Sequence, residues 1–232
     1  RIMTKLILSL LASLASMAAF AQESVESEGT LLAQSPFSMT VKVAGKAFEL
    51  DAGFHSGDVY RISLVAGRAS HESETSGGDL QAWQYVEEKS AVTGYYTLAQ
   101  FDARVWASRT TRHSVHLSSA AGSMNTKLEY SHNRYKPYNG AICPFGSCEK
   151  ALEEGNGGDD SVTLWVARAG ATYSYMLSRD NKGWLYTFDI GAGYLHVFNP
   201  QERTLGSATH HATLNTEIIA KSYGQAGLNV RF

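Results

Sequence analysis

His116 and Ser118 are the residues of this sequence best suited to covalent chemistry. One residue, Leu117, separates them, and side chains two apart in a strand point to the same side. A histidine base beside a serine hydroxyl is the core of nucleophilic acyl transfer, and a carboxylate that orients the histidine completes it. If the chain turns at 122–124, antiparallel pairing brings Glu129 opposite His116. The alternative, which we favour, is that these residues only share hydrogen bonds in a buried polar network.

Three further histidines, His196, His210 and His211, are candidates for a shared transition-metal site. Imidazole is a common ligand of transition metals. Adjacent histidines in a strand point to opposite sides, however, and no carboxylate pair or thiolate stands near them. Asp159 and Asp160 are more simply interpreted as a solvated loop turn than as a catalytic pair. We therefore expect no catalytic residues, no metal site and no cofactor.

Cys143 and Cys148 are the two cysteines of the chain, and they lie in the segment Cys-Pro-Phe-Gly-Ser-Cys. A redox site more often has the spacing Cys-x-x-Cys, and a zinc site needs further ligands nearby. In an exported protein such a pair favours a small structural disulfide loop. The sequence predicts this disulfide.

Residues 1–21 have the pattern of a secretory signal peptide. Lys5 precedes an apolar run over 6–20, and small residues at Ala19 and Ala21 predict cleavage before Gln22. The apolar run is shorter than the roughly 20 residues of a membrane-spanning helix. The full chain has a net charge of −2, and cleavage would remove Arg1 and Lys5, so nothing indicates a nucleic-acid partner.

The rest of the chain alternates between apolar and polar residues, which predicts an all-β fold. In 161–177 one face carries Trp165, Ala167, Ala169, Ala171, Tyr173, Tyr175 and Leu177. Eight such segments are expected, at 58–70, 80–88, 94–107, 113–121, 125–135, 161–177, 184–198 and 217–232. Short turns are expected at 89–93, 122–124 and 178–183, and long loops at 137–160 and 199–214.

The polar faces of these segments carry charges of both signs among small residues. Their members are Arg61, Gln100, Asp102, Arg104, His116, Lys127, Glu129, Arg168, Asp189, Glu217, Lys221, Gln225 and Arg231. The opposite faces carry bands of aromatic and aliphatic residues too wide for a surface in water. This combination favours a barrel with an apolar outside and a narrow interior of paired charges over a soluble barrel of lipocalin type.

The segment 35–56 also alternates, and its arms are shorter than the roughly 9–11 residues of a membrane strand. We interpret 22–57 as an N-terminal segment at the rim of the barrel, with an additional hairpin as the alternative. The barrel itself is assigned to 58–232. It would have eight strands, or ten if the hairpin joins it.

The closing segment ends at Phe232, after Ala226, Leu228 and Val230 on the same face. With the signal peptide and the aromatic-banded strands, it resembles the small outer-membrane β-barrel proteins of the OmpX/Ail and OmpA-transmembrane-domain type. In that family the terminal aromatic residue is a signal for the barrel assembly machinery. The resemblance implies an antiparallel transmembrane β-barrel in the outer membrane of a Gram-negative bacterium, surrounded by lipid and lipopolysaccharide.

The resemblance further implies a non-enzymatic protein with a structural, adhesive or host-interaction role. An extracellular ligand would be bound through the loops 137–160 and 199–214. Two alternatives stay open. One is a narrow pore. The other is a hydrolase, because His116, Ser118 and Glu129 are similar to the His-x-Ser and acidic residue of barrel enzymes that deacylate lipid A, although Ser119 stands where those enzymes have Asn.

Overall fold

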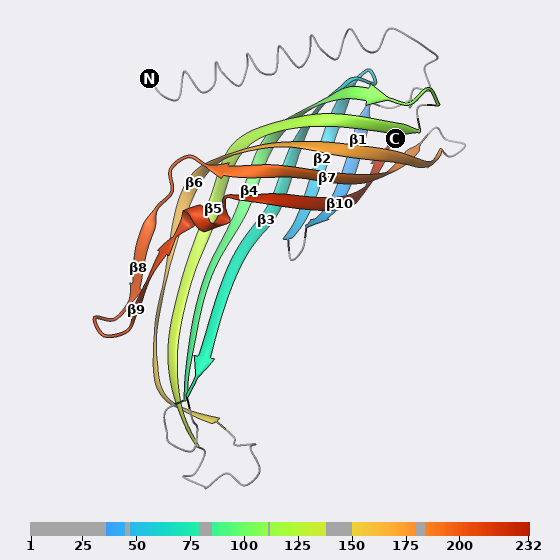
Figure 1. Ribbon diagram of the computed structural model, residues 1–232. Helices are drawn as coiled ribbons and strands as arrows, with labels where there is room; N and C mark the ends of the chain where they lie inside the picture. Colours follow the sequence, from blue (N-terminus) through green and yellow to red (C-terminus); the bar gives the residue numbers. More distant parts are fainter. Residues whose placement is uncertain (1–35, 45–46, 79–84, 111, 138–149, 180–183) are drawn as a thin grey trace, which may run out of the picture.

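The chain folds into a ring of long antiparallel strands (Figure 1). The computed structural model describes residues 36–44, 47–78, 85–110, 112–137, 150–179 and 184–232. The elements are β1 (Phe37–Ala44), β2 (Ala47–Ser56), β3 (Tyr60–Gly77), β4 (Tyr85–Ala107), β5 (His113–Pro137), β6 (Lys150–Arg179), β7 (Leu185–Val197), β8 (Glu202–Gly206), β9 (His211–Asn215), the 3-10 turn η3 (Thr216–Ile219) and β10 (Lys221–Arg231). Within these residues, no helix is long and apolar enough to cross a membrane.

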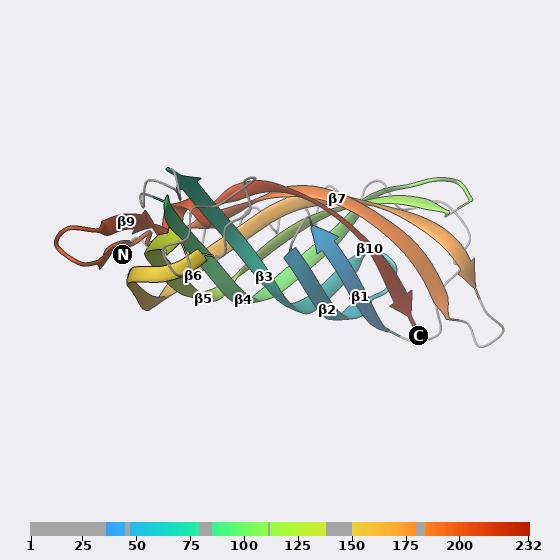
Figure 2. The same ribbon diagram turned by 90° about the horizontal axis from the view of Figure 1, so that it is seen from below.

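Eight of the described strands close the ring in the order β1-β10-β7-β6-β5-β4-β3-β2. The closure joins the first and the last strand, β1 and β10, which lie side by side (Figure 2). Ser38 pairs with Arg231 at one end of that seam. Beside this pair, the amide of Phe232 donates to the carbonyl of Phe37 at 3.1 Å. The expected all-β, eight-stranded barrel is therefore confirmed.

The outer face of the ring is apolar. Exposed side chains from neighbouring strands include Phe37, Val41, Phe54, Ile62, Leu64, Trp165, Ile190, Tyr194 and Leu228. The inner face of the same strands carries buried polar residues such as Thr40, Arg61 and Asp189. Water does not tolerate an apolar surface this wide, whereas lipid requires one. The face assignment made from the alternation is confirmed here.

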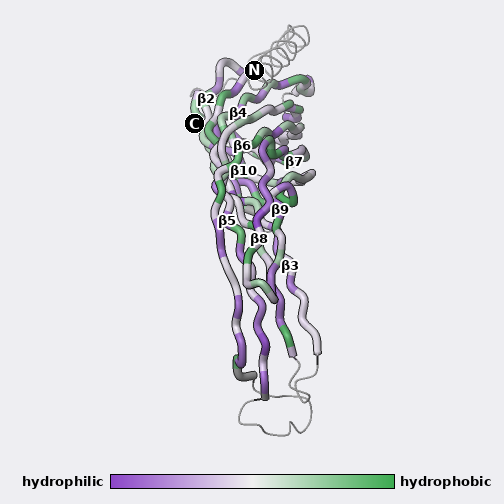
Figure 3. Tube along the Cα trace, turned by 90° about the vertical axis from the view of Figure 1, so that its left-hand side faces the viewer, coloured by the Kyte–Doolittle hydropathy of each residue, from purple (hydrophilic) through white to green (hydrophobic). Residues whose placement is uncertain are grey.

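The wall of the barrel differs in height around the ring. β3, β4, β5 and β6 have 18, 23, 25 and 30 residues, whereas β1, β2, β7 and β10 have 8, 10, 13 and 11. The long strands therefore project beyond the apolar band as one curved sheet (Figure 1). We call this projection, 68–77, 85–94, 126–137 and 150–162, the extended wall. It is hydrophilic along much of its length (Figure 3).

The count of eight strands was right, but four of the expected segments were divided wrongly. The described part of segment 80–88, residues 85–88, and the whole of 94–107 belong to the single strand β4, and 113–121 and 125–135 both belong to β5. Turns at 89–93 and 122–124 do not exist. Gly122 was taken as a turn residue, yet it lies inside the sheet, where a β-carbon would come 2.0 Å from the carbonyl oxygen of Thr97. Its role is a close approach between strands.

The N-terminal hairpin supplies the two strands that this merging removes. Residues 37–44 and 47–56 form β1 and β2 inside the closed ring, so the interpretation as a rim element and the barrel boundary at residue 58 were wrong. The ten-stranded alternative was wrong for the same reason. Such short strands suffice because each needs to cover only the apolar band, with Met39, Val43 and Leu50 among its outward residues.

The described parts of the expected long loops are largely strands. Residues 150–160 continue β6, and the stretch 199–214 contains most of the β8–β9 hairpin, followed by η3. Ser178 and Arg179, which were expected in the turn 178–183, belong to β6 instead. The signal peptide at 1–21 and both cysteines lie outside the described residues.

Candidate functional site: a filled lumen beneath an apolar cap

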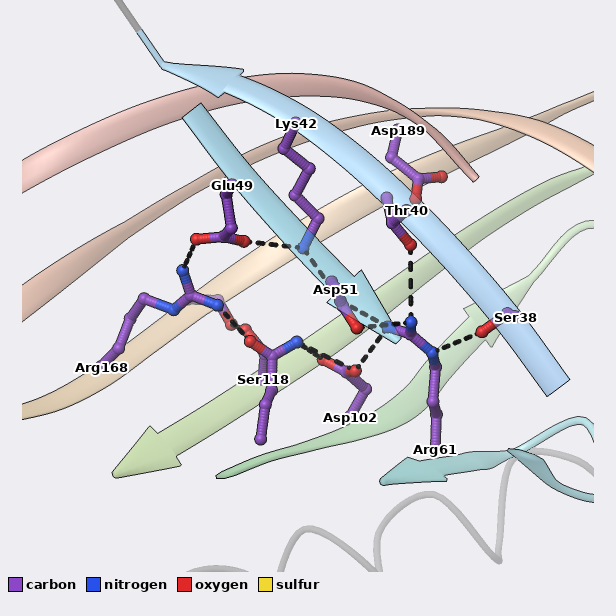
Figure 4. A network of polar contacts seen from close by, with 12 residues as sticks. Ser38, Thr40, Lys42, Glu49, Asp51, Arg61, Asp102, Ser118, Arg168 and Asp189 are labelled. Atoms are coloured by element: carbon purple, nitrogen blue, oxygen red, sulfur yellow. Dashed lines mark hydrogen bonds and ion pairs between the residues drawn. The ribbon is translucent and has the colours of Figure 1, made fainter. Parts of the chain in front are cut away.

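A continuous polar network fills the inside of the barrel, which we call the lumen. It joins three cations, Lys42, Arg61 and Arg168, to three carboxylates, Glu49, Asp51 and Asp102 (Figure 4). All six residues are buried. They come from β1, β2, β3, β4 and β6, and therefore link strands across the ring.

Arg61 forms the centre of one half of this network. Its guanidinium donates to both oxygens of Asp51, at 2.7 and 2.6 Å, and to Asp102 at 3.4 Å. It also donates to the hydroxyl of Ser38 at 2.8 Å. A fork-shaped guanidinium matched to one carboxylate in this way is among the stronger polar contacts in proteins. Arg61 therefore ties β3 to β1, β2 and β4.

Arg168 forms the centre of the other half. It donates to the carboxylate of Glu49 and to the amide oxygen of Gln100, and its guanidinium lies 5.5 Å from the ring centre of Tyr223. Gln100 in turn donates to Asp102 at 2.8 Å, which connects the two halves. The hydroxyl of Tyr96 donates to Glu49 at 2.9 Å.

Glycines provide the space for these large side chains. A β-carbon on Gly53 would come 2.5 Å from Nε of Arg61, and one on Gly67 would come 2.5 Å from the phenol of Tyr96. Each glycine lies on β2 or β3 beside the group it accommodates. Because an eight-stranded barrel is only wide enough for side chains, the network occupies the lumen.

A second, apolar group of residues lies above the network. Its buried members are Val65, Val92, Leu98, Ala120, Met124, Leu128, Tyr130, Leu164, Val166, Leu195, Val197, Leu205 and Ile219. Leu205 belongs to β8 and Ile219 to η3, and Ala212 and Leu214 of β9 pack against the group. The hairpin and η3 thus bury part of the inner side of the extended wall, at Val92, Leu128 and Tyr130. We call this assembly the cap.

Polar contacts fasten the cap at its edges. Arg203 of β8 pairs with Asp160 at 2.9 Å, and Asp160 lies in β6, so the interpretation of this residue as part of a loop turn was wrong. The ring of His210 stacks on that of His132 of β5, with 4.0 Å between centres. The hydroxyl of Tyr130 donates to Glu88 at 2.7 Å, and burial, followed by this hydrogen bond, raises the pKa of Tyr130 to about 12.

The residues that were predicted on the polar faces of the strands lie in different parts of the molecule. Arg61, Gln100, Asp102, Arg168, Asp189 and Arg231 are buried on the inner face, as expected. Lys127 and Glu129 instead pair with each other at 2.5 Å on the exposed side of the extended wall. Glu217 is exposed in η3. Arg231 pairs with Asp58 at 2.9 Å near the seam.

The candidate hydrolase triad is not assembled. Nε2 of His116 lies 2.9 Å from the hydroxyl of Ser114, and the hydroxyl of Ser118 donates to the carbonyl of Gly170 at 3.3 Å. Glu129 is on the same continuous strand, roughly 40 Å away at about 3.3 Å per residue. The proposed pairing of Glu129 with His116 required a turn at 122–124, and β5 runs straight through it.

The other predicted sites have separate positions. His196 packs edge-on against Phe198, 5.0 Å between ring centres. Among the described residues, no group of three or more His, Cys, Asp or Glu is placed to hold a metal ion. Phe232 packs against Trp184, with ring centres 5.7 Å apart. Its role as an assembly signal stays a prediction.

Sequence reasoning missed Lys42, Glu49 and Asp51, which supply one cation and two carboxylates of the network. The signal was present, since Glu49 and Asp51 alternate with Phe48, Leu50 and Ala52. It was set aside because the strand seemed too short to span a membrane. Tyr96 and Tyr223 were missed because aromatic residues were assigned to the outer face.

No family profile matches the sequence, and no curated protein matches it. Solved structures of similar shape include CarO of Acinetobacter baumannii (11% identity, TM-score 0.39, 88% of this chain and 100% of that chain). Others are Ail, the attachment invasion locus protein of Yersinia pestis (11%, 0.37, 84% and 93%) and the N-terminal β-barrel domain of Pseudomonas aeruginosa OprF (10%, 0.30, 84% and 95%).

The class of protein follows from the molecule's own geometry. A closed antiparallel ring, an apolar outer band and a polar, filled interior together define a β-barrel of the outer-membrane type. Such barrels keep short turns on the periplasmic side and long segments outside the cell. The extended wall and the cap are therefore extracellular, and the end at Phe37 and Phe232 is periplasmic.

Proposed function

We propose that this protein is a non-conducting, non-enzymatic barrel that presents the extended wall as a contact surface outside the cell. The observation that carries the proposal is the cap: the β8–β9 hairpin and η3 pack against the inner side of the extended wall and bury Val92, Leu128 and Tyr130 there. A projection that only linked one barrel strand to the next would not need such support. A braced sheet keeps its outer face in one shape, which lowers the entropic cost of binding a partner.

The outer face of the extended wall has the chemistry of a contact surface in water. Lys89 pairs with Glu74 at 3.0 Å, and Lys127 pairs with Glu129 at 2.5 Å, all four side chains being about half exposed. Exposed pairs of this kind add little to stability. They are therefore available to exchange partners with a charged surface, and charge complementarity of this sort sets the rate and specificity of association.

The lumen and the cap both argue against the narrow pore. Ions crossing the lumen would have to displace buried pairs such as Arg61 with Asp51 and Arg168 with Glu49. Above them, Leu98, Met124 and Ile219 are fully or almost fully buried in the apolar cap. An aqueous path needs a wider barrel.

The test compares attachment and conductance of the same full-length protein. Cells displaying the wild type should attach to immobilised host-cell surface material more strongly than cells without it. The variant Glu74→Gln, Lys89→Gln, Lys127→Gln and Glu129→Gln should lose that gain, whereas Arg112→Gln at the periplasmic end should keep it. Stable ion channels formed by the purified wild type in planar bilayers would contradict the proposal, as would attachment equal to that of cells without the protein.

A further inference from the structure

The barrel wall has a lateral gap above the short hairpin. Pairing of β2 with β3 ends at Glu49 and Gly67, and pairing of β1 with β10 ends at Val43 and Ala226. β3 continues to Gly77 and β10 begins at Lys221. In the described part of the chain, no strand pairs with the edges 68–77 and 221–225 on the side where β1 and β2 have ended. The gap lies between these two edges.

A cavity of about 180 Å³ occupies this gap, and we call it the side cavity. It is lined by residues from both faces of the wall. Lys42, Glu49, Tyr96, Arg168 and Tyr223 line it from the lumen, and Phe48, Arg68, Ser70 and Ser222 line it from the outer side. It therefore runs from the lipid-facing surface to the upper end of the lumen network.

Apolar residues form the walls between these ends. Ala69 and Leu195 line the cavity from β3 and β7, and Ile219 of η3 lines it from the cap. Phe48 is half exposed on the outer surface beside it. A molecule in the side cavity would thus contact an apolar wall along its length and polar groups at its ends.

The charge of the lining favours an anion. Lys42, Arg68 and Arg168 line the side cavity, against one carboxylate, Glu49. Nε of Arg68 and Nε of Arg168 are buried and make no hydrogen bond within the described residues. Arg168 itself is 5% exposed. A buried donor without an acceptor is unfavourable, and a bound anion would supply the acceptor.

The position of the cavity's opening relative to the apolar band shows from which leaflet a ligand would enter. On β3, Ile62, Leu64 and Ala66 face lipid, and Arg68 follows on the same outer side, 5.9 Å from the ring centre of Tyr95. Arginine directly above an apolar band marks the boundary between lipid and water, where amphiphiles place their heads. The opening therefore faces the outer leaflet at its headgroup level.

We propose that the side cavity binds a small single-chain amphiphile with an anionic head, of the class of a medium-chain carboxylate, which enters sideways from the outer leaflet. The head accepts hydrogen bonds from the Arg68 guanidinium at the mouth of the cavity, and the chain lies against Ala69, Leu195 and Ile219. A cavity of about 180 Å³ admits a short chain and excludes a whole lipid.

The experiment measures saturable binding of labelled octanoate to the full-length protein in nanodiscs, with empty nanodiscs subtracted. Octylammonium tests the sign of the head, and acetate tests the need for a chain. We expect octanoate to bind and the other two not to. Equal binding of octylammonium would overturn the anion site, and equal binding of acetate would overturn the apolar wall.

Variants locate the site. Ala69→Phe fills the cavity, and Arg68→Gln removes a cation at its mouth; each should weaken octanoate binding by about tenfold or more. Ala66→Phe on the lipid-facing side of β3 and Arg112→Gln at the periplasmic end are the matched controls and should bind as the wild type does. Slower gel migration after boiling checks folding of each variant. Undiminished binding by folded Arg68→Gln or Ala69→Phe, or no saturable binding by the wild type, would overturn the proposal.

Discussion

The lumen and the cap are lined by the same strands, yet their chemistry is opposite. On β5 the inner face carries His116 and Ser118 at the level of the lumen, and Met124 and Leu128 at the level of the cap. The outer face carries Leu117 below and Lys127 above. The two faces of one strand exchange polarity where it leaves the bilayer, because lipid surrounds the lower part and water the upper part.

This exchange shows what holds each region together. In the lumen, charged groups stay buried because each has an opposite charge or a donor within reach, as Arg61 has Asp51 and Asp102. In the cap, the hairpin covers Val92, Leu128 and Tyr130 much as a soluble protein covers its core. The lower region therefore depends on pairing and the upper region on apolar burial.

The largest expected effect comes from breaking a buried pair and comparing it with an exposed one. Arg168→Leu leaves Glu49 buried without its guanidinium partner and should lower the free energy of unfolding by about 3–5 kcal/mol. Arg203→Leu removes the exposed pair with Asp160 in the cap and should cost about 0–1 kcal/mol. Urea unfolding midpoints in micelles measure both, and equal losses would contradict the division between lumen and cap.

The cap should respond to the loss of apolar volume. Leu128→Ala removes a fully buried side chain and should destabilise the cap by about 2–5 kcal/mol. Protease cleavage within the β8–β9 hairpin should then accelerate, while the barrel keeps its folded gel migration. The hairpin of the variant Leu152→Ala, which changes an exposed position of β6, should be cleaved at the wild-type rate. If Leu128→Ala unfolded the barrel together with the cap, the stability of the cap would not be independent of that of the barrel.

The part of β5 where its two faces exchange polarity can be tested at Gly122. Because the carbonyl of Thr97 lies where a β-carbon would go, Gly122→Ala should force the two strands apart and cost about 1–3 kcal/mol. Ser123→Ala, on the opposite face, should be nearly neutral. If residues 122–124 formed a turn, alanine would be tolerated at both positions, and comparison of the two unfolding midpoints decides this.

The smallest effect is expected on the outer face of the extended wall. Lys127→Gln breaks the pair with Glu129, whose two side chains are 51% and 48% exposed, and should change stability by less than about 1 kcal/mol. Unfolding midpoints at low and high salt should both lie close to the wild type. A loss as large as that of Arg168→Leu would mean that the outer face is buried in a contact.

The class of fold and the faces of most strands can be predicted from the amino-acid sequence. Period-2 alternation identifies Trp165 and Tyr173 as outward and Arg168 as inward, because side chains of a strand must alternate whatever surrounds it. It also placed Asp102 and Asp189 inside. These assignments depend only on local geometry and on the difference between lipid and a narrow interior.

The ends of the strands and the pairing of the charges depend on contacts between distant parts of the chain. The sequence pattern shifts near 122–124, and a turn explains that shift as well as a change of surroundings does. Only pairing with β4 and β6 shows that β5 continues. Likewise, Glu49 and Arg168 are 119 residues apart, and no local pattern can join them. They meet because closure of the ring places β2 across the lumen from β6.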